Sequence, residues 1–291
     1  MASAGSHTRL RSKPADPLST RVLRTTAAFG KERRAWLWHM LGSLCGMPAT
    51  GYYFVAYAYG KWIDDRIDDP AADVAASTRF LDRQQEVTDG ACAPACAGEM
   101  LGSRLGRFFR SPGGSPLCEA WRGLFQTFRV DLERRGRPIG AADLNALIEQ
   151  LGGSVLDLAA ISLGQSGGLC RTVRRDASRV YIGVDMMLDL GPDLRAGTIN
   201  IPREDFTKHD IPLAVTLRAD MATLRDHPGF RRWVSGRIAE LADAHARARR
   251  LARSIRPRLV GWCLRLLLAD RGAKLARLRR RWPEVERGGG A

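Results

Sequence analysis

The stretch KWIDDRIDDP, residues 61–70, places four aspartates at positions 64, 65, 68 and 69. An α-helix turns once in about 3.6 residues, so Asp64 stacks on Asp68 and Asp65 stacks on Asp69 along one helix face. Stacked carboxylates repel one another, by roughly a few tenths of a kcal/mol per pair on an isolated helix and by more where water is excluded. The pattern therefore predicts a helix whose acidic end needs a compensating cation.

A second row of aspartates, Asp185, Asp189 and Asp193, lies in VYIGVDMMLDLGPD, residues 180–193. The flanking residues are almost all apolar, which is typical of a buried helix, and no lysine or arginine stands between Arg179 and Arg195. Buried carboxylates either take up a proton or find a partner. Mg²⁺ suits this role because it takes one or two carboxylates, several waters and the oxygens of a substrate phosphate, so we expect about two or three such ions. The alternative is a solvated acidic turn in the first stretch and a capped helix end in the second.

The rest of the chain is typical of one all-α domain. Its 291 residues, 45% of them hydrophobic, suffice for a large core. Apolar residues recur at helical spacing, and breaks rich in glycine, proline or serine fall at residues 90–94, 111–116, 135–140 and 164–168. We expect one domain over residues 19–283, with tails at residues 1–18 and 284–291.

The net charge of +15 is concentrated near the C-terminus, where residues 231–287 hold 17 Lys and Arg against 5 Asp and Glu, a difference of +12. This part reads as two helices, residues 230–254 and 257–281. The arginine-rich stretches 246–258 and 274–282 suit a solvated face, a nucleic acid or an anionic membrane surface. We favour the solvated face, expect no nucleic acid, and leave open peripheral membrane contact. A further alternative is that arginines of the last helix reach a phosphate-binding pocket.

The cellular compartment can be argued from two features. Six dispersed cysteines, and no secretory pattern in the first residues, predict a reducing cytoplasm without disulfides. The stretch Ala35–Gly60 has no charged residue and roughly meets the length of a membrane span. Glycine, serine, proline and threonine cluster in its middle, however, which favours two short buried helices joined by a turn.

Both acidic stretches resemble signatures of one family, the squalene/phytoene synthases. Residues 57–70, YAYGKWIDDRIDDP, are similar to the first aspartate-rich motif of that family, and residues 183–206, GVDMMLDLGPDLRAGTINIPREDF, are similar to the second. The resemblance implies a single-domain isoprenoid-synthase helical bundle with a central cavity. It also implies a prenyltransferase, in which carboxylates from two facing helices hold Mg²⁺ and an allylic prenyl diphosphate that leaves as pyrophosphate.

The resemblance also assigns roles to individual residues. The implied catalytic residues are Asp64, Asp68, Asp185 and Asp189. The implied metal ligands are Asp64, Asp65, Asp68, Asp69, Asp185, Asp189 and Asp193, and the implied diphosphate contacts are Lys61 and Arg195. The implied lining of the cavity is Phe54, Tyr57, Tyr59, Tyr181, Met186 and Met187, for which packing in the core is an equally open alternative.

The chain departs from the family pattern around the second row. Ile182 and Asp185 stand where the family usually has Gln-x-x-Asn, and Leu188 stands where it has an arginine. Residues 197–202 read GTINIP in place of Gly-Arg-x-Tyr-Leu-Pro, and Leu147 stands at the position of a tyrosine linked to cyclopropyl chemistry. These changes spare the aspartates and remove groups associated with a second prenyl diphosphate.

We therefore expect ionisation of one allylic diphosphate and transfer of its prenyl group to a small aromatic acceptor in secondary metabolism. An electron-rich ring can attack the allylic cation without a second diphosphate site. One alternative is head-to-head coupling of two prenyl diphosphates to products such as presqualene diphosphate, squalene or phytoene. The others are a non-catalytic relative that binds prenyl diphosphates or a partner protein, and a basic helical protein that binds nucleic acid.

Overall fold

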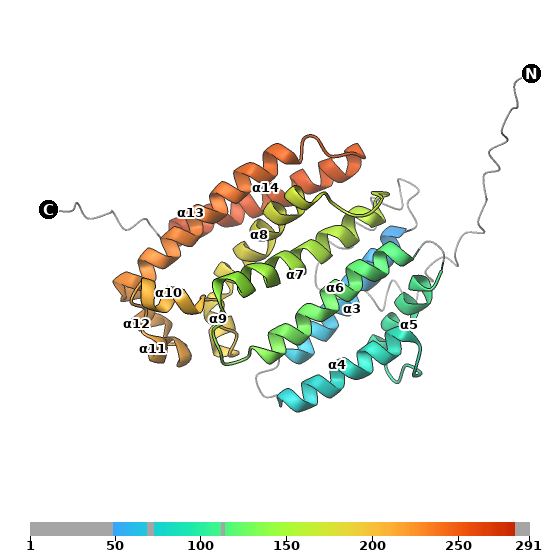
Figure 1. The fold of residues 1–291 in the computed structure, drawn as a ribbon, viewed down its shortest axis with the longest axis horizontal. Helices are drawn as coiled ribbons and strands as arrows, with labels where there is room; N and C mark the ends of the chain where they lie inside the picture. Colours follow the sequence, from blue (N-terminus) through green and yellow to red (C-terminus); the bar gives the residue numbers. More distant parts are fainter. Residues whose placement is uncertain (1–48, 69–72, 112–113, 283–291) are drawn as a thin grey trace, which may run out of the picture.

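The computed structural model describes residues 49–68, 73–111 and 114–282, whose regular secondary structure is helical throughout (Figure 1). The prediction of an all-α fold is confirmed. The two predicted tails, residues 35–48 of the uncharged stretch, and Asp69 lie outside the described residues. The helices are α3 (Ala49–Ile67), α4 (Val74–Asp89), α5 (Ala97–Phe109), α6 (Ser115–Glu133), α7 (Ala141–Ser162), α8 (Arg171–Leu188), α9 (Leu190–Arg195), α10 (Arg203–Lys208), α11 (Leu213–Leu217), α12 (Met221–Asp226), α13 (Pro228–Leu251) and α14 (Arg258–Arg281).

Helix α7 lies in the middle of the bundle, between α6 and α8 (Figure 1). On one side of it, α13 and α14 pack against α8, and on the other side α3 packs against α5, α6 and α7. Among the described helices, α7 is long and apolar enough to cross a membrane by length and composition. Its contacts on both sides are those of a core helix, because an all-round apolar helix is buried by its neighbours.

The two C-terminal helices form as their apolar spacing predicts. Pro228 occupies the first turn of α13, where a missing N–H costs nothing. The inward faces of α13 and α14 carry Trp233, Leu264 and Leu268, each at most 5% exposed, and these side chains pack with α8 in one apolar cluster. Burial of each such side chain contributes roughly 1.5–3 kcal/mol. This packing fixes α14 alongside the second aspartate row.

The second aspartate row does not lie on one continuous helix. Helix α8 ends at Leu188, Asp189 has non-helical dihedrals (φ −96°, ψ 8°), and α9 begins at Leu190. The break is explained by Pro192, whose nitrogen has no hydrogen to donate to the carbonyl four residues earlier. Hydrogen bonds from Asp189 N to Asp185 O (2.9 Å) and from Asp193 N to Asp189 O (2.8 Å) nevertheless preserve the spacing of the row. The predicted stacking thus survives, although the predicted single helix was wrong.

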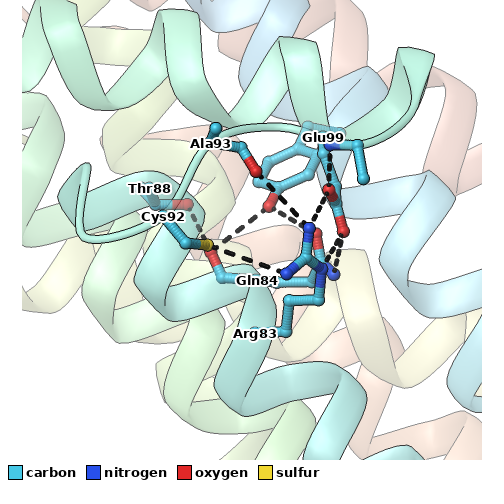
Figure 2. A network of polar contacts seen from close by, with 8 residues as sticks. Arg83, Gln84, Thr88, Cys92, Ala93 and Glu99 are labelled. Carbon is cyan, nitrogen blue, oxygen red and sulfur yellow. Dashed lines mark hydrogen bonds and ion pairs between the residues drawn. The ribbon is translucent and has the colours of Figure 1, made fainter.

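A polar network ties α3, α4 and α5 together inside the bundle (Figure 2). The buried carboxylate of Glu99 accepts hydrogen bonds from Arg83 Nε at 2.7 Å and Nη2 at 2.9 Å, and from the backbone N–H of Ala95 at 2.7 Å. Gln84 donates to the same carboxylate at 3.4 Å and accepts from the Tyr59 hydroxyl at 3.0 Å. These bonds lower the pKa of Glu99, chiefly through Arg83. The network holds α3 in a fixed rotation about its axis.

Replacement of Glu99 by alanine should destabilise the protein by about 3 kcal/mol, because three donors lose their acceptor inside the bundle. Unfolding in urea measures this loss, and replacement of the exposed Glu86 on α4 is the matched control, with an effect below about 0.5 kcal/mol. Since the pKa of Glu99 is lowered, its contribution is present above the ordinary glutamate pKa and decreases as the pH falls. Equal losses in the two variants would contradict the assigned role.

Candidate active site

The acidic end of α3 is organised by Lys61. Its ammonium nitrogen lies 2.8 Å from Asp64 Oδ2 and 2.8 Å from Asp65 Oδ1. The three residues are one turn apart, as their i, i+3 and i+4 spacing predicts. All three side chains are more than a third exposed, so their charges remain accessible to a ligand.

The second row begins at Asp185, which is held by two cations from α14. Asp185 Oδ1 accepts a hydrogen bond from Arg271 Nη1 at 2.7 Å and lies 3.0 Å from Lys274 Nζ. Arg271 is itself buried, and its guanidinium lies 4.3 Å from the ring centre of Tyr181. The sequence near Asp185 offers no cation, so its need for a partner predicted a metal ion. The tertiary fold instead supplies arginine and lysine from 86 and 89 residues further along the chain.

The row ends at Asp193, which is held by a chain of buried polar groups. Asn200 Nδ2 donates to Asp193 Oδ2 at 2.7 Å, and Arg134 Nη2 of α6 donates to Asn200 Oδ1 at 2.8 Å. Arg134 also donates to the Ile199 carbonyl at 3.0 Å and to Asp131 at 2.6 Å. The chain fixes the position of one carboxylate oxygen and leaves the other available.

The two rows face each other closely enough to interact through charge. Loss of hydration raises the pKa of Asp193 to about 7, with help from repulsion by Asp189 and by Asp68 of the opposite row. Loss of hydration and repulsion by Asp64 also raise the pKa of Asp68 to about 7. Loss of hydration raises the pKa of Asp189, and Lys61 of α3 is among the groups that oppose this rise. The site therefore collects more negative charge than its own cations offset.

An apolar cavity of about 120 Å³ reaches the second aspartate row at Arg271. Its walls come from α3, α7, α8 and α14, and include Tyr53, Tyr57, Leu156, Tyr181, Leu264 and Arg271. Arg271 belongs both to the charged aspartate site and to the cavity wall, because it donates a hydrogen bond to Asp185 and lines the cavity. The arrangement is a charged mouth joined to an apolar chamber.

Of the residues expected to line the cavity, the structure places some in the cavity wall and others in the hydrophobic core. Tyr57 and Tyr181 line it. Phe54 and Tyr59 lie in the core instead, at 2% and 0% exposed. Tyr59 stacks on Trp62 and Trp121, at ring-centre distances of 5.8 and 5.4 Å, so its face is not available to a ligand.

The two methionines of α8 lie on other faces of that helix than the cavity. Met186 packs with Leu144 and Ile148 of α7, and Met187 is 7% exposed in the core. The reason is helical geometry, because each residue turns the helix by about 100°. Tyr181 and Asp185, four residues apart, therefore share the face that meets the site, while Met186 does not.

Several residues of the site were absent from the sequence prediction. They are Tyr53, Arg134, Asn200, Arg271 and Lys274. The position of Asn200 within the second family signature was a signal that could have found it, and the two α14 cations agree with the alternative that the last helix reaches the site. Arg195 is exposed at the end of α9, and within the described residues no bond joins it to either row.

The donor set fits a hard divalent cation that shares its shell with a ligand. Among the described residues, no three His, Cys, Asp or Glu side chains are close enough to hold one ion by themselves. Mg²⁺ needs fewer protein ligands, because waters and phosphate oxygens complete its shell. Asp68 and Asp193 are the candidate ligands, since burial raises the pKa of each and the charge of Asp68 contributes to the raised pKa of Asp193 in the other row.

Comparison with known proteins agrees with this geometry. The family model for squalene/phytoene synthase matches residues 43–288. The chain belongs to the squalene/phytoene synthase family. It is thus a prenyltransferase, an isoprenoid synthase that uses a prenyl diphosphate.

A solved structure shows the same fold. Squalene synthase HpnC from Alicyclobacillus acidocaldarius superposes with a TM-score of 0.65 at 20% sequence identity, covering 90% of this chain and 92% of that chain. The predicted isoprenoid-synthase bundle is therefore confirmed. A search of curated proteins finds no match.

The stability of the metal-free protein should fall as the pH rises from about 5 to 8. Asp68 and Asp193 have folded-state pKa values raised from 3.8 to about 7, so the folded state binds more protons than the unfolded state within this window. Thermal midpoints measured across the window should decline less in Asp193→Asn, which keeps a hydrogen bond to Asn200. Added Mg²⁺ should offset the decline. A midpoint that rises over this window in the metal-free protein would contradict the assignment.

Proposed function

We propose that the protein binds an allylic prenyl diphosphate together with Mg²⁺ between its two aspartate rows and transfers the prenyl group to a small aromatic acceptor. The observation that carries the proposal is the junction of the charged mouth with the apolar cavity at Arg271. A prenyl diphosphate has the same two-part character, an anionic head on a hydrocarbon chain. Its head matches the mouth, and its chain matches the chamber.

The metal ligands in this proposal are Asp64 and Asp68 of the first row and Asp189 and Asp193 of the second, with Asp65 and, by its position in the sequence, Asp69 as further candidates. When bound, Mg²⁺ would offset the charge of the diphosphate as it leaves. Asp185 takes a different part, because it already has two cations. It positions Arg271 and Lys274 toward the head group.

The residues of the chain then favour ionisation. The bond between the allylic carbon and the diphosphate oxygen breaks, and its electron pair leaves with the pyrophosphate, toward the positive charge of Lys61, Arg271 and Lys274. The allylic cation that remains lies among aromatic side chains of the cavity, such as Tyr53 and Tyr57, whose π faces favour positive charge. The ring of the acceptor supplies the electron pair of the new carbon–carbon bond and then loses a proton to the released pyrophosphate.

The charge balance around Asp185 favours an acceptor without a diphosphate. The family usually has asparagine at this position, which would leave Lys274 without this carboxylate and Arg271, among the described residues, with Asp270 alone, at 3.8 Å, so that more positive charge could bind a second anionic head. Here the Asp185 carboxylate is within 3.0 Å of both cations. Less positive charge therefore remains for a second diphosphate.

We place the reaction in secondary metabolism and in the cytoplasm as part of the same proposal.

Head-to-head coupling of two prenyl diphosphates is the second candidate. Membership of the squalene/phytoene synthase family favours it, and the structure with the same fold is that of a squalene synthase. Both candidates share the first ionisation, and they differ in the molecule that receives the cation.

The acceptor can be identified from the products. We expect that the protein with Mg²⁺ and prenyl diphosphates of three chain lengths releases pyrophosphate and, when aromatic metabolites such as carbazoles and indoles are added, forms singly prenylated rings detectable by mass spectrometry. Without an aromatic acceptor, prenyl alcohol should be the main product. Presqualene diphosphate, squalene or phytoene-type products would instead support the second candidate and exclude the first.

Replacement of Asp64 or Asp189 by asparagine should lower the rate of pyrophosphate release by at least about 100-fold, because each change removes a proposed ligand of the Mg²⁺ that would offset the charge of the leaving group. A phosphate-release assay after pyrophosphatase treatment measures the rate. Asp243→Asn, at an exposed position of α13, is the matched control and should be unaffected. Activity within a few-fold of wild type in both site variants would favour the non-catalytic alternative.

A further inference from the structure

The outer face of the hairpin formed by α13 and α14 combines positive charge with exposed apolar side chains. Six exposed arginines lie at the end of α13, in the turn that follows it and in the first two turns of α14: Arg249, Arg250, Arg253, Arg256, Arg258 and Arg265. Between Arg249 and Ala269 the sequence contains no aspartate or glutamate. Trp262 and Leu266, one turn apart on α14, are 42% and 49% exposed in the middle of this charge. We call these eight residues the arginine–tryptophan surface.

This surface lies directly over the apolar cavity. The opposite face of the same two turns of α14, with Val260, Cys263 and Leu264, lines the cavity. The hairpin, the loop after α7 and the start of α3 gather at one end of the bundle (Figure 1). One helix thickness therefore separates the outer tryptophan from the chamber that we assign to the prenyl chain.

We propose that the arginine–tryptophan surface docks the protein on an anionic lipid membrane, where it collects prenyl diphosphates held in the bilayer surface. Arginines around an exposed tryptophan and leucine match a bilayer interface, which offers negative head groups above an apolar layer. A nucleic acid fits less well, since one tryptophan and one leucine provide little base stacking. The substrate part of this proposal rests on the proposed function, whereas the docking part does not.

Other occupants of the surface are disfavoured by charge and length. Residues 1–48 hold 8 Lys and Arg against 2 Asp and Glu, so this segment would be repelled. Residues 283–291 follow the far end of α14, and Arg258 at its start lies about 35 Å from Arg281, so nine extended residues, which span about 30 Å, cannot cover the whole surface. A second copy that used the same face would bring like charges together.

Sedimentation with vesicles tests the docking. We expect the full-length protein to bind vesicles of phosphatidylcholine with about 30% phosphatidylglycerol, to release as salt increases, and to bind pure phosphatidylcholine much less. The variant R256Q/R258Q should bind the anionic vesicles about 25-fold less, at roughly fivefold per arginine. W262S should weaken binding as well. The matched control R279Q/R280Q loses the same charge at the other end of α14 and should bind like the wild type.

Each other outcome overturns the docking proposal. Equal losses in R256Q/R258Q and R279Q/R280Q would show that overall charge is responsible. No preference for anionic vesicles would exclude a membrane partner. Salt-dependent binding to single-stranded RNA that R256Q/R258Q removes, without vesicle binding, would assign the surface to nucleic acid. Self-association that W262S removes, seen by sedimentation equilibrium, would assign it to a second copy.

Turnover of a soluble prenyl diphosphate without vesicles separates this proposal from the proposed function. W262S and R256Q/R258Q should keep wild-type turnover in that assay and lose the stimulation by anionic vesicles. Turnover without vesicle binding would refute the docking alone. Vesicle binding without turnover of any prenyl diphosphate would refute the proposed function and leave the docking in place.

Discussion

Repulsion between two rows of carboxylates is the constraint around which the site is built. Asp68 and Asp193 belong to different rows, burial raises the pKa of each to about 7, and the charge of Asp68 contributes to the shift of Asp193. The fold holds them there through apolar packing elsewhere, chiefly of α7 against its neighbours. The chain thus stores an unfavourable arrangement that a cationic ligand relieves. The raised pKa values of these two carboxyl groups distinguish the site physically from an acidic surface exposed to solvent.

The protein compensates this repulsion differently at the two ends of the second row. At one end Arg271 and Lys274 neutralise Asp185 directly. At the other end the chain from Arg134 through Asn200 orients Asp193 without cancelling its charge, because Asn200 is neutral. Positive charge is therefore fixed beside the apolar cavity, and negative charge is left where the two rows meet. This gradient would orient an anionic head and its hydrocarbon chain in one direction only.

Helix α14 links the two proposals. Its inner face supplies Arg271 to the mouth and Leu264 to the wall of the cavity, while its outer face carries Trp262. A helix that is amphipathic in this way can bring an amphiphile from a lipid surface to a buried site over a short path. The excess positive charge of the C-terminal helices therefore has two proposed roles. Inside the bundle it pairs with Asp185, and outside the bundle it forms the arginine–tryptophan surface.

The sequence by itself determined the all-α fold, the two aspartate rows and the contact of Lys61 with Asp64, because these depend on neighbours within about one helical turn. The family resemblance, and not local spacing, suggested Tyr57 and Tyr181, which do line the cavity. Only the tertiary structure decided that Asp185 meets Arg271, that Asn200 supports Asp193, and that Tyr59 is buried in the core. Such contacts join residues distant in the chain, and they depend on the rotation of each packed helix, which local periodicity does not specify.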